Sequence, residues 1–170
     1  MADPPTPSRR RFLTAHAGGV ALAALAGCAD DAGRDPGEGN DSGRAGAELD
    51  LREANVVGVA FEPADDGYAF DVTLRHDDDG EAGYANWWQV ERLDGSRLGR
   101  RDLLHAHAEQ PFTRSDTVAV PDEVTCVVVR GHDQTHGYGG VAAVVDLDTG
   151  VIEWAEQGAD PRSFDATDCP

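Results

Sequence analysis

Two histidine pairs are the residues of this chain whose type and spacing best suit metal chemistry. His105 and His107 are separated by one residue, and His132 and His136 by three. In an extended strand, residues i and i+2 point to the same side, so His105 and His107 would converge on one ion at about 2.0–2.1 Å from each nitrogen. If the chain brings the two pairs together, their imidazoles predict a Zn²⁺ or Cu²⁺ site.

The same histidines have two further interpretations that need no metal. Asp102, Glu109 and Asp133 lie close to them in the sequence, which favours ordinary hydrogen bonding between imidazole and carboxylate. The glycine-rich segment 132–140 follows a predicted strand, and loops held by rigid sheets often form binding surfaces. All three interpretations remain open at the level of sequence.

No catalytic residue is predicted. The chain has no nucleophile elbow, phosphate-binding loop or dinucleotide fingerprint. The acidic stretch 77–81 lacks the ligand spacing of a calcium loop, so we expect it to be a solvated turn. His76, just before it, is expected to have a structural role at the end of a strand. A non-enzymatic protein is therefore favoured over an enzyme.

The elements that would position these residues are strands. Apolar and polar residues alternate with a period of two through much of the region 53–157, and Asp, Gly and Pro turn signals separate the runs. About seven strands are expected, at 56–61, 68–75, 86–93, 98–107, 117–120, 124–131 and 141–147. This predicts an all-β, immunoglobulin/fibronectin-like antiparallel β-sandwich, with a small β-barrel as the alternative. The expected core contains Trp88 or Trp87, with Phe61, Phe70, Val72, Leu74, Val118 and Val128.

The start of the chain has the features of an export signal. Arginines precede about a dozen small and apolar residues, a run shorter than the roughly 20 that span a bilayer. The order of Arg9, Arg10, Phe12 and Leu13 resembles a twin-arginine translocation signal, and Leu-Ala-Gly before Cys28 resembles a lipobox. The resemblance implies that residues 1–27 are removed after passage through the twin-arginine export machinery. Lipidated Cys28 would then anchor the protein to the outer face of the cell membrane.

Two further segments and a cysteine pair complete the predicted organisation. Residues 28–52, which include lipidated Cys28, are expected to form a flexible acidic tether, and residues 158–170 an acidic C-terminal tail. An oxidising exterior favours a disulfide between Cys126 and Cys169, worth roughly 4 kcal/mol by loop entropy. A buried free Cys126 with a loose tail is the alternative.

The composition indicates the solvent and excludes one class of partner. The chain has 32 acidic residues against 14 basic ones, all of them arginine, and a formal net charge of −18. This pattern resembles the proteins of extreme halophiles, because the Debye length of about 3 Å at about 1 M salt removes most self-repulsion. Nucleic acid is not expected as a partner, because the chain has no basic cluster to neutralise phosphates.

The segments 109–115 and 132–140 resemble an uncharacterised group of small exported β proteins. The resemblance covers roughly residues 68–145 and implies one compact domain, but it supplies no catalytic residues. The prediction for function is therefore a lipid-anchored, non-enzymatic interaction or envelope module. The alternatives are a histidine-based Zn or Cu-binding surface lipoprotein and a metal-dependent enzyme, with a protein or a metal ion as the partner.

Overall fold

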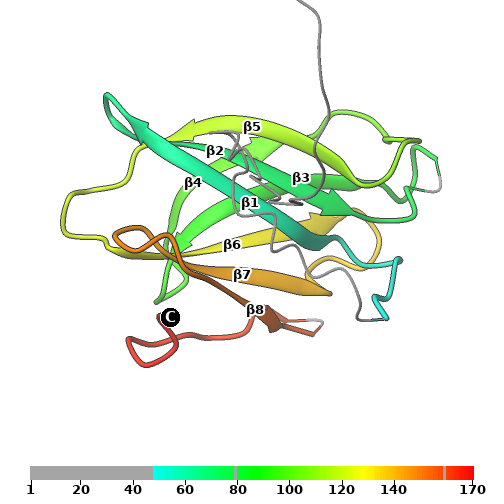
Figure 1. The fold of residues 1–170 in the computed structure, drawn as a ribbon. Helices are drawn as coiled ribbons and strands as arrows, with labels where there is room; N and C mark the ends of the chain where they lie inside the picture. Colours follow the sequence, from blue (N-terminus) through cyan, green and yellow to red (C-terminus); the bar gives the residue numbers. More distant parts are fainter. Residues whose placement is uncertain (1–47, 79, 159) are drawn as a thin grey trace, which may run out of the picture. The chain divides into compact units, whose positions relative to one another are not determined.

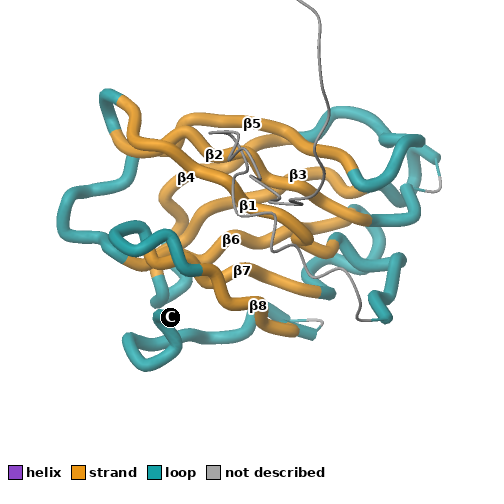
Figure 2. The backbone as a smooth tube through the Cα atoms, in the orientation of Figure 1, coloured by secondary structure: helices purple, strands orange, loops and turns teal. Residues whose placement is uncertain are grey.

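The computed structural model of the protein describes residues 48–78, 80–158 and 160–170. The export signal residues Arg9, Arg10, Phe12 and Leu13, the lipidation residue Cys28 and most of the predicted tether lie outside these ranges. The described residues form eight strands and no α-helix (Figures 1 and 2). In this part of the chain no helix is long and apolar enough to cross a membrane.

The eight strands form two antiparallel sheets. Their bounds are β1 Asn55–Ala64, β2 Gly67–Arg75, β3 Ala85–Arg92, β4 Arg97–Asp102, β5 Phe112–Val118, β6 Cys126–Asp133, β7 Val141–Asp146 and β8 Ile152–Glu156. One sheet has the order β1-β2-β5 and the other the order β4-β3-β6-β7-β8. The described residues therefore form a β-sandwich, as predicted, and not the alternative closed barrel.

Tight turns join neighbouring strands because the sequence places residues there that tolerate unusual backbone angles. Gly95 adopts a φ of 84° between β3 and β4, a conformation that side chains with a Cβ rarely adopt. β1 and β2 are joined through Asp65 and Asp66, and their register runs from Ala64 opposite Gly67 to Asn55 opposite Arg75. Such short connections require antiparallel pairing.

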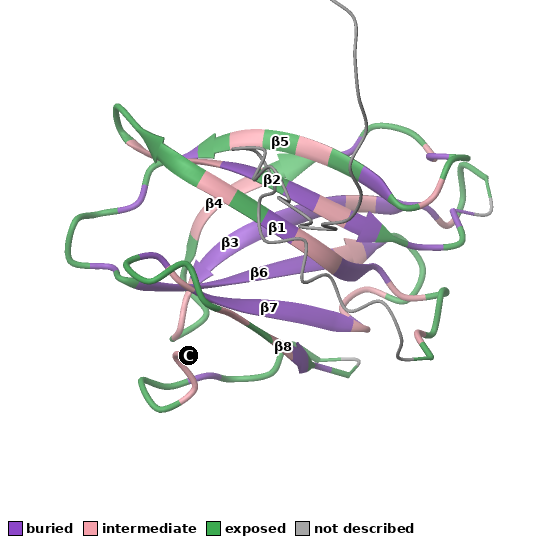
Figure 3. Ribbon diagram, viewed as in Figure 1, coloured by how far each residue is buried: buried purple, intermediate pink, exposed green. Residues whose placement is uncertain are grey.

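The main core lies between the two sheets. It contains the predicted Phe70, Val72, Leu74 and Val118, and Phe61 packs against it while remaining partly exposed. Of the two adjacent tryptophans, Trp88 is fully buried in this core. The strands β6 and β7 are buried almost throughout, whereas β4 and β5 consist largely of exposed and half-buried residues (Figure 3).

A second apolar cluster covers the outer face of the five-stranded sheet. The predicted core residue Val128 belongs to it rather than to the main core, together with Cys126, Ala142, Val144, Ala155 and Phe164. Phe164 comes from the C-terminal segment, which crosses this face. A disulfide joins Cys126 to Cys169 with a Cα–Cα distance of 6.1 Å, inside the usual range.

Beside this cluster, a buried ion pair ties the C-terminal segment to the sheet. Arg130 in β6 is 1% exposed, and its Nε lies 2.7 Å from Glu91 Oε2 in β3. Its Nη1 donates to Gln157 Oε1 at 2.5 Å, and its Nη2 to the carbonyl of Arg162 at 2.5 Å. A buried guanidinium requires such full pairing, because an unpaired charge in the interior is strongly destabilising.

Three strand predictions were wrong in detail. The expected strand 98–107 ends at Asp102, so His105 and His107 lie in the loop between β4 and β5. The expected strand 117–120 runs instead from Phe112 to Val118. The strand β8 was not predicted and raises the number in the described residues from seven to eight.

The disulfide yields the first prediction. Replacing Cys126 and Cys169 together by Ser should lower the free energy of unfolding by about 4 kcal/mol, because the bond closes a 43-residue separation in the unfolded chain. Chemical denaturation of the variant and of the wild type would measure the change. The wild type treated with a reductant is the matched control and should unfold at the same denaturant concentration as the double variant. A wild type whose unfolding is unaffected by reductant would contradict the prediction.

Candidate functional site

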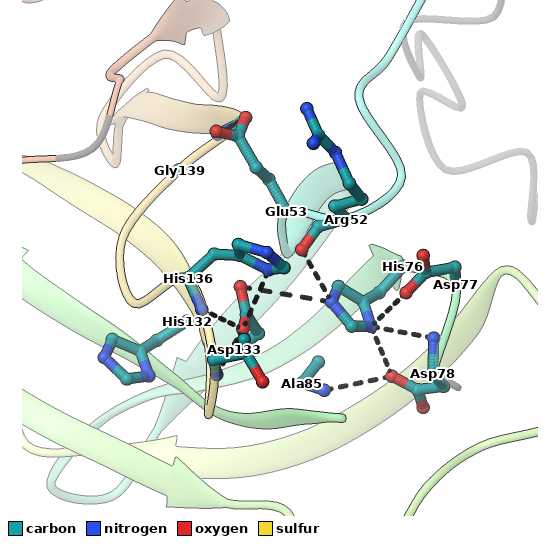
Figure 4. A network of polar contacts seen from close by, with 12 residues as sticks. Arg52, Glu53, His76, Asp77, Asp78, Ala85, His132, Asp133, His136 and Gly139 are labelled. Atoms are coloured by element: carbon teal, nitrogen blue, oxygen red, sulfur yellow. Dashed lines mark hydrogen bonds and ion pairs between the residues drawn. The ribbon is translucent and has the colours of Figure 1, made fainter. Parts of the chain in front are cut away.

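A buried network of histidine and aspartate lies at one end of the sandwich (Figure 4). His76 follows the last residue of β2 and is 1% exposed. Its Nδ1 lies 2.7 Å from Asp78 Oδ1, and its Nε2 lies 3.0 Å from the carbonyl oxygen of Arg52. The residues just before β1 are thus fastened to the end of β2.

The hydrogen bonds of His76 require a proton on one ring nitrogen, Nε2. A carbonyl oxygen only accepts, so Nε2 must donate to Arg52. Nδ1 faces both the backbone N–H of Asp78 at 2.8 Å and the Asp78 carboxylate. A hydrogen bond from the backbone N–H requires an Nδ1 without a proton, whereas a hydrogen bond to the carboxylate requires an Nδ1–H. Nδ1 can therefore form only one of these two hydrogen bonds at a time.

Asp78 is held as an acceptor by several groups. Its Oδ1 accepts the backbone N–H of Ala85 at 2.9 Å, and its Oδ2 accepts that of His107 at 2.5 Å. The backbone of Asp78 has a positive φ of 38°, which residues other than glycine rarely adopt. The expectation of a solvated turn at 77–81 is therefore wrong for Asp78, which is only 7% exposed.

Asp133 at the end of β6 is the second buried carboxylate of the network. Its Oδ1 accepts the backbone N–H groups of Thr135 at 2.7 Å and His136 at 2.6 Å, and so caps the turn after the strand. Its Oδ2 has no hydrogen-bond partner among the described residues and lies 4.0 Å from His76 Nε2. The half-exposed His136 ring lies at the solvent side of this carboxylate, with Nδ1 3.5 Å from Oδ1.

The pair His105 and His107 lies in the loop that follows β4. Their ring centroids are 4.7 Å apart, and the His107 ring stacks on Phe112 at 3.9 Å. His107 Nδ1 is buried without a hydrogen bond to any described residue and lies 3.5 Å from Asp78 Oδ2. Burial lowers the pKa of His107, and the positive charges of Arg114 and His105 lower it further.

His132 lies on the outer face of the five-stranded sheet. Its ring stacks on Trp87 with centroids 4.2 Å apart, and the guanidinium of Arg100 lies 3.8 Å from the centre of the same tryptophan. Its Nδ1 is 2.8 Å from Asn86 Oδ1. Burial is the main cause that lowers the pKa of His132. This packing explains why Trp88, not Trp87, fills the main core.

The structure groups the four predicted histidines in a way that the sequence did not indicate. His105 and His107 lie together, but not through the strand geometry on which their prediction was based. His132 points away from the network that contains His136 (Figure 4). Within the described ranges, no three His, Cys, Asp or Glu side chains form a group that could hold a metal ion. Binding of Zn or Cu stays a prediction.

Asp78 was not expected from the sequence, Asp133 was expected only as a partner for the nearby histidines, and the role of His76 was understated. A signal for His76 was present, because it continues the even-numbered inward phase of Phe70, Val72 and Leu74. Its contacts with Arg52 and Asp78 had no such signal, since they depend on how the loops fold.

One curated relative matches the chain. A protein of the haloarchaeon Halomicrobium mukohataei, named "Putative lipoprotein", is 63% identical over 125 residues, which cover 73% of this chain and 62% of the relative. The chain thus aligns with less than two thirds of that relative's length. No family model matches the chain. No solved structure matches it either.

The buried network yields the second prediction. His76→Phe should lower the free energy of unfolding by about 3 kcal/mol, because it leaves the Asp78 carboxylate and the Arg52 carbonyl without their ring partner. Chemical denaturation measures the loss. Arg52→Gln is the control, since it changes an exposed side chain and keeps the carbonyl. Equal stability of the two variants would refute a structural role for His76.

The stacked His132 yields the third prediction. Because its pKa is lowered in the folded state, the folded protein binds fewer protons than the unfolded chain just below the ordinary value of about 6.5. The stability due to neutral His132 is therefore complete above that value and is lost as the pH falls. His132→Phe should show a smaller loss between about pH 7.5 and about pH 5 than the wild type, measured by denaturation at constant salt. An unchanged pH dependence would disprove the assignment.

Proposed function

We propose that this protein is an exported lipoprotein whose sandwich domain acts as a non-enzymatic interaction module at the outer face of the cell membrane. The observation that carries the proposal is the 63% identity to a protein named as a lipoprotein, together with Leu-Ala-Gly before Cys28 in this chain. The order of Arg9, Arg10, Phe12 and Leu13 supports export through the twin-arginine machinery.

The physical chemistry of lipid anchoring agrees with this arrangement. A single acyl chain binds a membrane only marginally, at about 0.8 kcal/mol for each buried methylene, whereas two chains on one cysteine give a stable anchor. Residues between Cys28 and the first strand would then set the distance of the domain from the lipid. His76 donates a hydrogen bond to the Arg52 carbonyl, so the end of this connection is held against the domain at Arg52.

The composition supports a role in concentrated salt. Most of the 32 acidic residues must lie on the surface, and their mutual repulsion is screened over about 3 Å at about 1 M salt. The Halomicrobium relative comes from a halophile. The interaction role is further supported by the two rigid sheets, which hold loops at the ends of the sandwich, where binding residues commonly occur.

The anchor yields the fourth prediction. In a halophilic archaeal host, the wild-type chain should be found in the membrane fraction, and Cys28→Ser should be exported but released into the medium, because the serine cannot accept the lipid thioether. Immunoblots of the membrane, cytoplasm and medium fractions measure the distribution. Replacing Arg9 and Arg10 together by Lys is the paired control and should retain the protein in the cytoplasm. A Cys28→Ser protein that remains in the membrane would overturn the proposal.

A further inference from the structure

A cavity of about 440 Å³ opens where the edges of the two sheets meet. One wall is β4, the edge strand of the five-stranded sheet, and the other is β5, the edge strand of the three-stranded sheet. The loop that joins them closes one side. The residues that line the cavity and determine its binding chemistry are Arg101, Arg114, Asp116, His105, His107 and Leu104.

The register of the sheets directs two arginines into this opening. Arg101 pairs with Trp88 and Arg114 pairs with Val72, and residues directly opposite each other in antiparallel strands point to the same face. Trp88 and Val72 are fully buried in the core between the sheets. Both guanidinium groups therefore face the space between the sheets at its open edge.

These inward charges do not neutralise one another. Among the described residues, the Arg101 side chain makes no hydrogen bond or ion pair. The Arg114 side chain donates only to the carbonyl of its neighbour Thr113, at 2.7 Å, and its guanidinium lies 5.5 Å from the centre of the Phe112 ring. Asp116 accepts the backbone N–H of Thr117 and pairs with neither arginine. All the guanidinium donors of Arg101, and those of Arg114 other than Nη1, are thus without a hydrogen-bond partner among the described residues beside the cavity.

The surroundings of the cavity are positive, although the chain as a whole carries a formal charge of −18. Three arginines and two aspartates line it, together with two histidines. The lowered pKa of His107 has burial as its main cause, and Arg114 and His105 lower it further, whereas Asp78 raises it. This charge disfavours a metal cation here and favours an anion.

We propose that this cavity binds an oxyanion group, a carboxylate, sulfate or phosphate, on a molecule of about the size of one sugar residue, with Arg101 and Arg114 as its partners. A guanidinium presents parallel N–H donors that match the two oxygens of such a group. The volume lies within the range of about 300–1,000 Å³ that is typical of small-molecule sites. Leu104, which is 81% exposed, supplies an apolar contact for the rest of the ligand.

The binding chemistry suits a salty solvent. At about 1 M salt the Debye length is about 3 Å, so the long-range electrostatic interaction between the acidic protein and an ion of either sign is screened. Paired, charge-assisted hydrogen bonds act at contact distance and are directional, which distinguishes an oxyanion from chloride. The site does not depend on the lipid anchor, so it can be tested separately from it.

The test uses the full chain carrying Cys28→Ser, purified in chloride buffer and titrated with sulfate, phosphate, galacturonate and uncharged galactose. Isothermal titration calorimetry gives the affinity, and NMR shifts of the arginine side-chain N–H groups give the location. Galacturonate should bind with shifts at Arg101 and Arg114, and galactose should not bind. Arg101→Gln and Arg114→Gln should each weaken binding at least about tenfold, because each removes a charge-assisted fork.

Two variants serve as controls. Arg97→Gln removes a cation from the same strand β4, but from outside the cavity, and should leave the affinity unchanged. Arg101→Lys keeps the positive charge but loses the parallel N–H donors of the guanidinium. Its affinity should therefore lie between those of Arg101→Gln and the wild type. Circular dichroism shows whether each variant is folded. If Arg114→Gln does not fold, the exposed Arg101 decides the test alone.

The outcomes separate the sources of the oxyanion and the competing explanations. Equal binding of sulfate, phosphate and galacturonate would support a site for free inorganic anions, and preference for galacturonate would support a carboxylate-bearing sugar. The proposal would be overturned if no anion bound the wild type, or if Arg97→Gln weakened binding as much as Arg101→Gln. It would also be overturned if Zn²⁺ alone bound this region and His105→Ala abolished that binding. The inward arginines would then only keep the sheet edges from pairing with other chains.

Discussion

The structure depends on the burial of strand β6 on both of its faces. One face, with Val127 and Val129, contributes to the core between the sheets, and the other carries Val128 and Arg130. A sandwich of two sheets covers only the first face. The C-terminal segment supplies the second cover, because Phe164 packs on the apolar part and the carbonyl of Arg162 satisfies the arginine. The segment after β8 is thus part of the domain.

Burial of carboxylates follows one rule across this acidic protein. Glu91, Asp78 and Asp133 are almost completely buried, and each accepts hydrogen bonds from Arg130 or from backbone N–H groups. These interactions replace the water that the carboxylate oxygens lose on folding, except at Asp133 Oδ2, which has no hydrogen-bond partner among the described residues. Within the described ranges, the other acidic side chains are partly or fully exposed, where salt screens them. Glu91 secures the C-terminal segment, and Asp78 with Asp133 secures the loops at the end that carries the histidines.

The sequence was sufficient for what depends on local alternation. The even-numbered residues of β2 face inward from Phe70 onward, and the sandwich follows from such strands and the turns between them. It failed where apolar residues do not form a strand. Leu103 and Leu104 follow β4 and extended the predicted strand to His107, yet Leu104 is 81% exposed and the chain turns there. β8 was missed because the segment 152–156 has only five residues and is bounded by polar residues, so its alternation is short.

The candidate site was harder to predict because its contacts join distant segments. His76, Asp78 and His107 meet only after the loops fold, and no pattern along the chain gives the distance between loops. The separation of His132 from His136 has a clear cause, since His132 is in the strand and stacks on Trp87, whereas His136 lies beyond the turn that Asp133 caps. Spacing alone could not separate those two environments.

The two edge strands that meet at the cavity show why binding chemistry is expected at this position. In the middle of a sheet, a buried guanidinium must be fully paired, as Arg130 is beneath the C-terminal segment. At an open edge, water can solvate Arg101 and Arg114 when no ligand is present, so they need no partner within the fold. The same feature that makes these charges tolerable leaves their donors free. An edge between two sheets is therefore the position in this sandwich where unpaired arginines can be both stable and available to an anion.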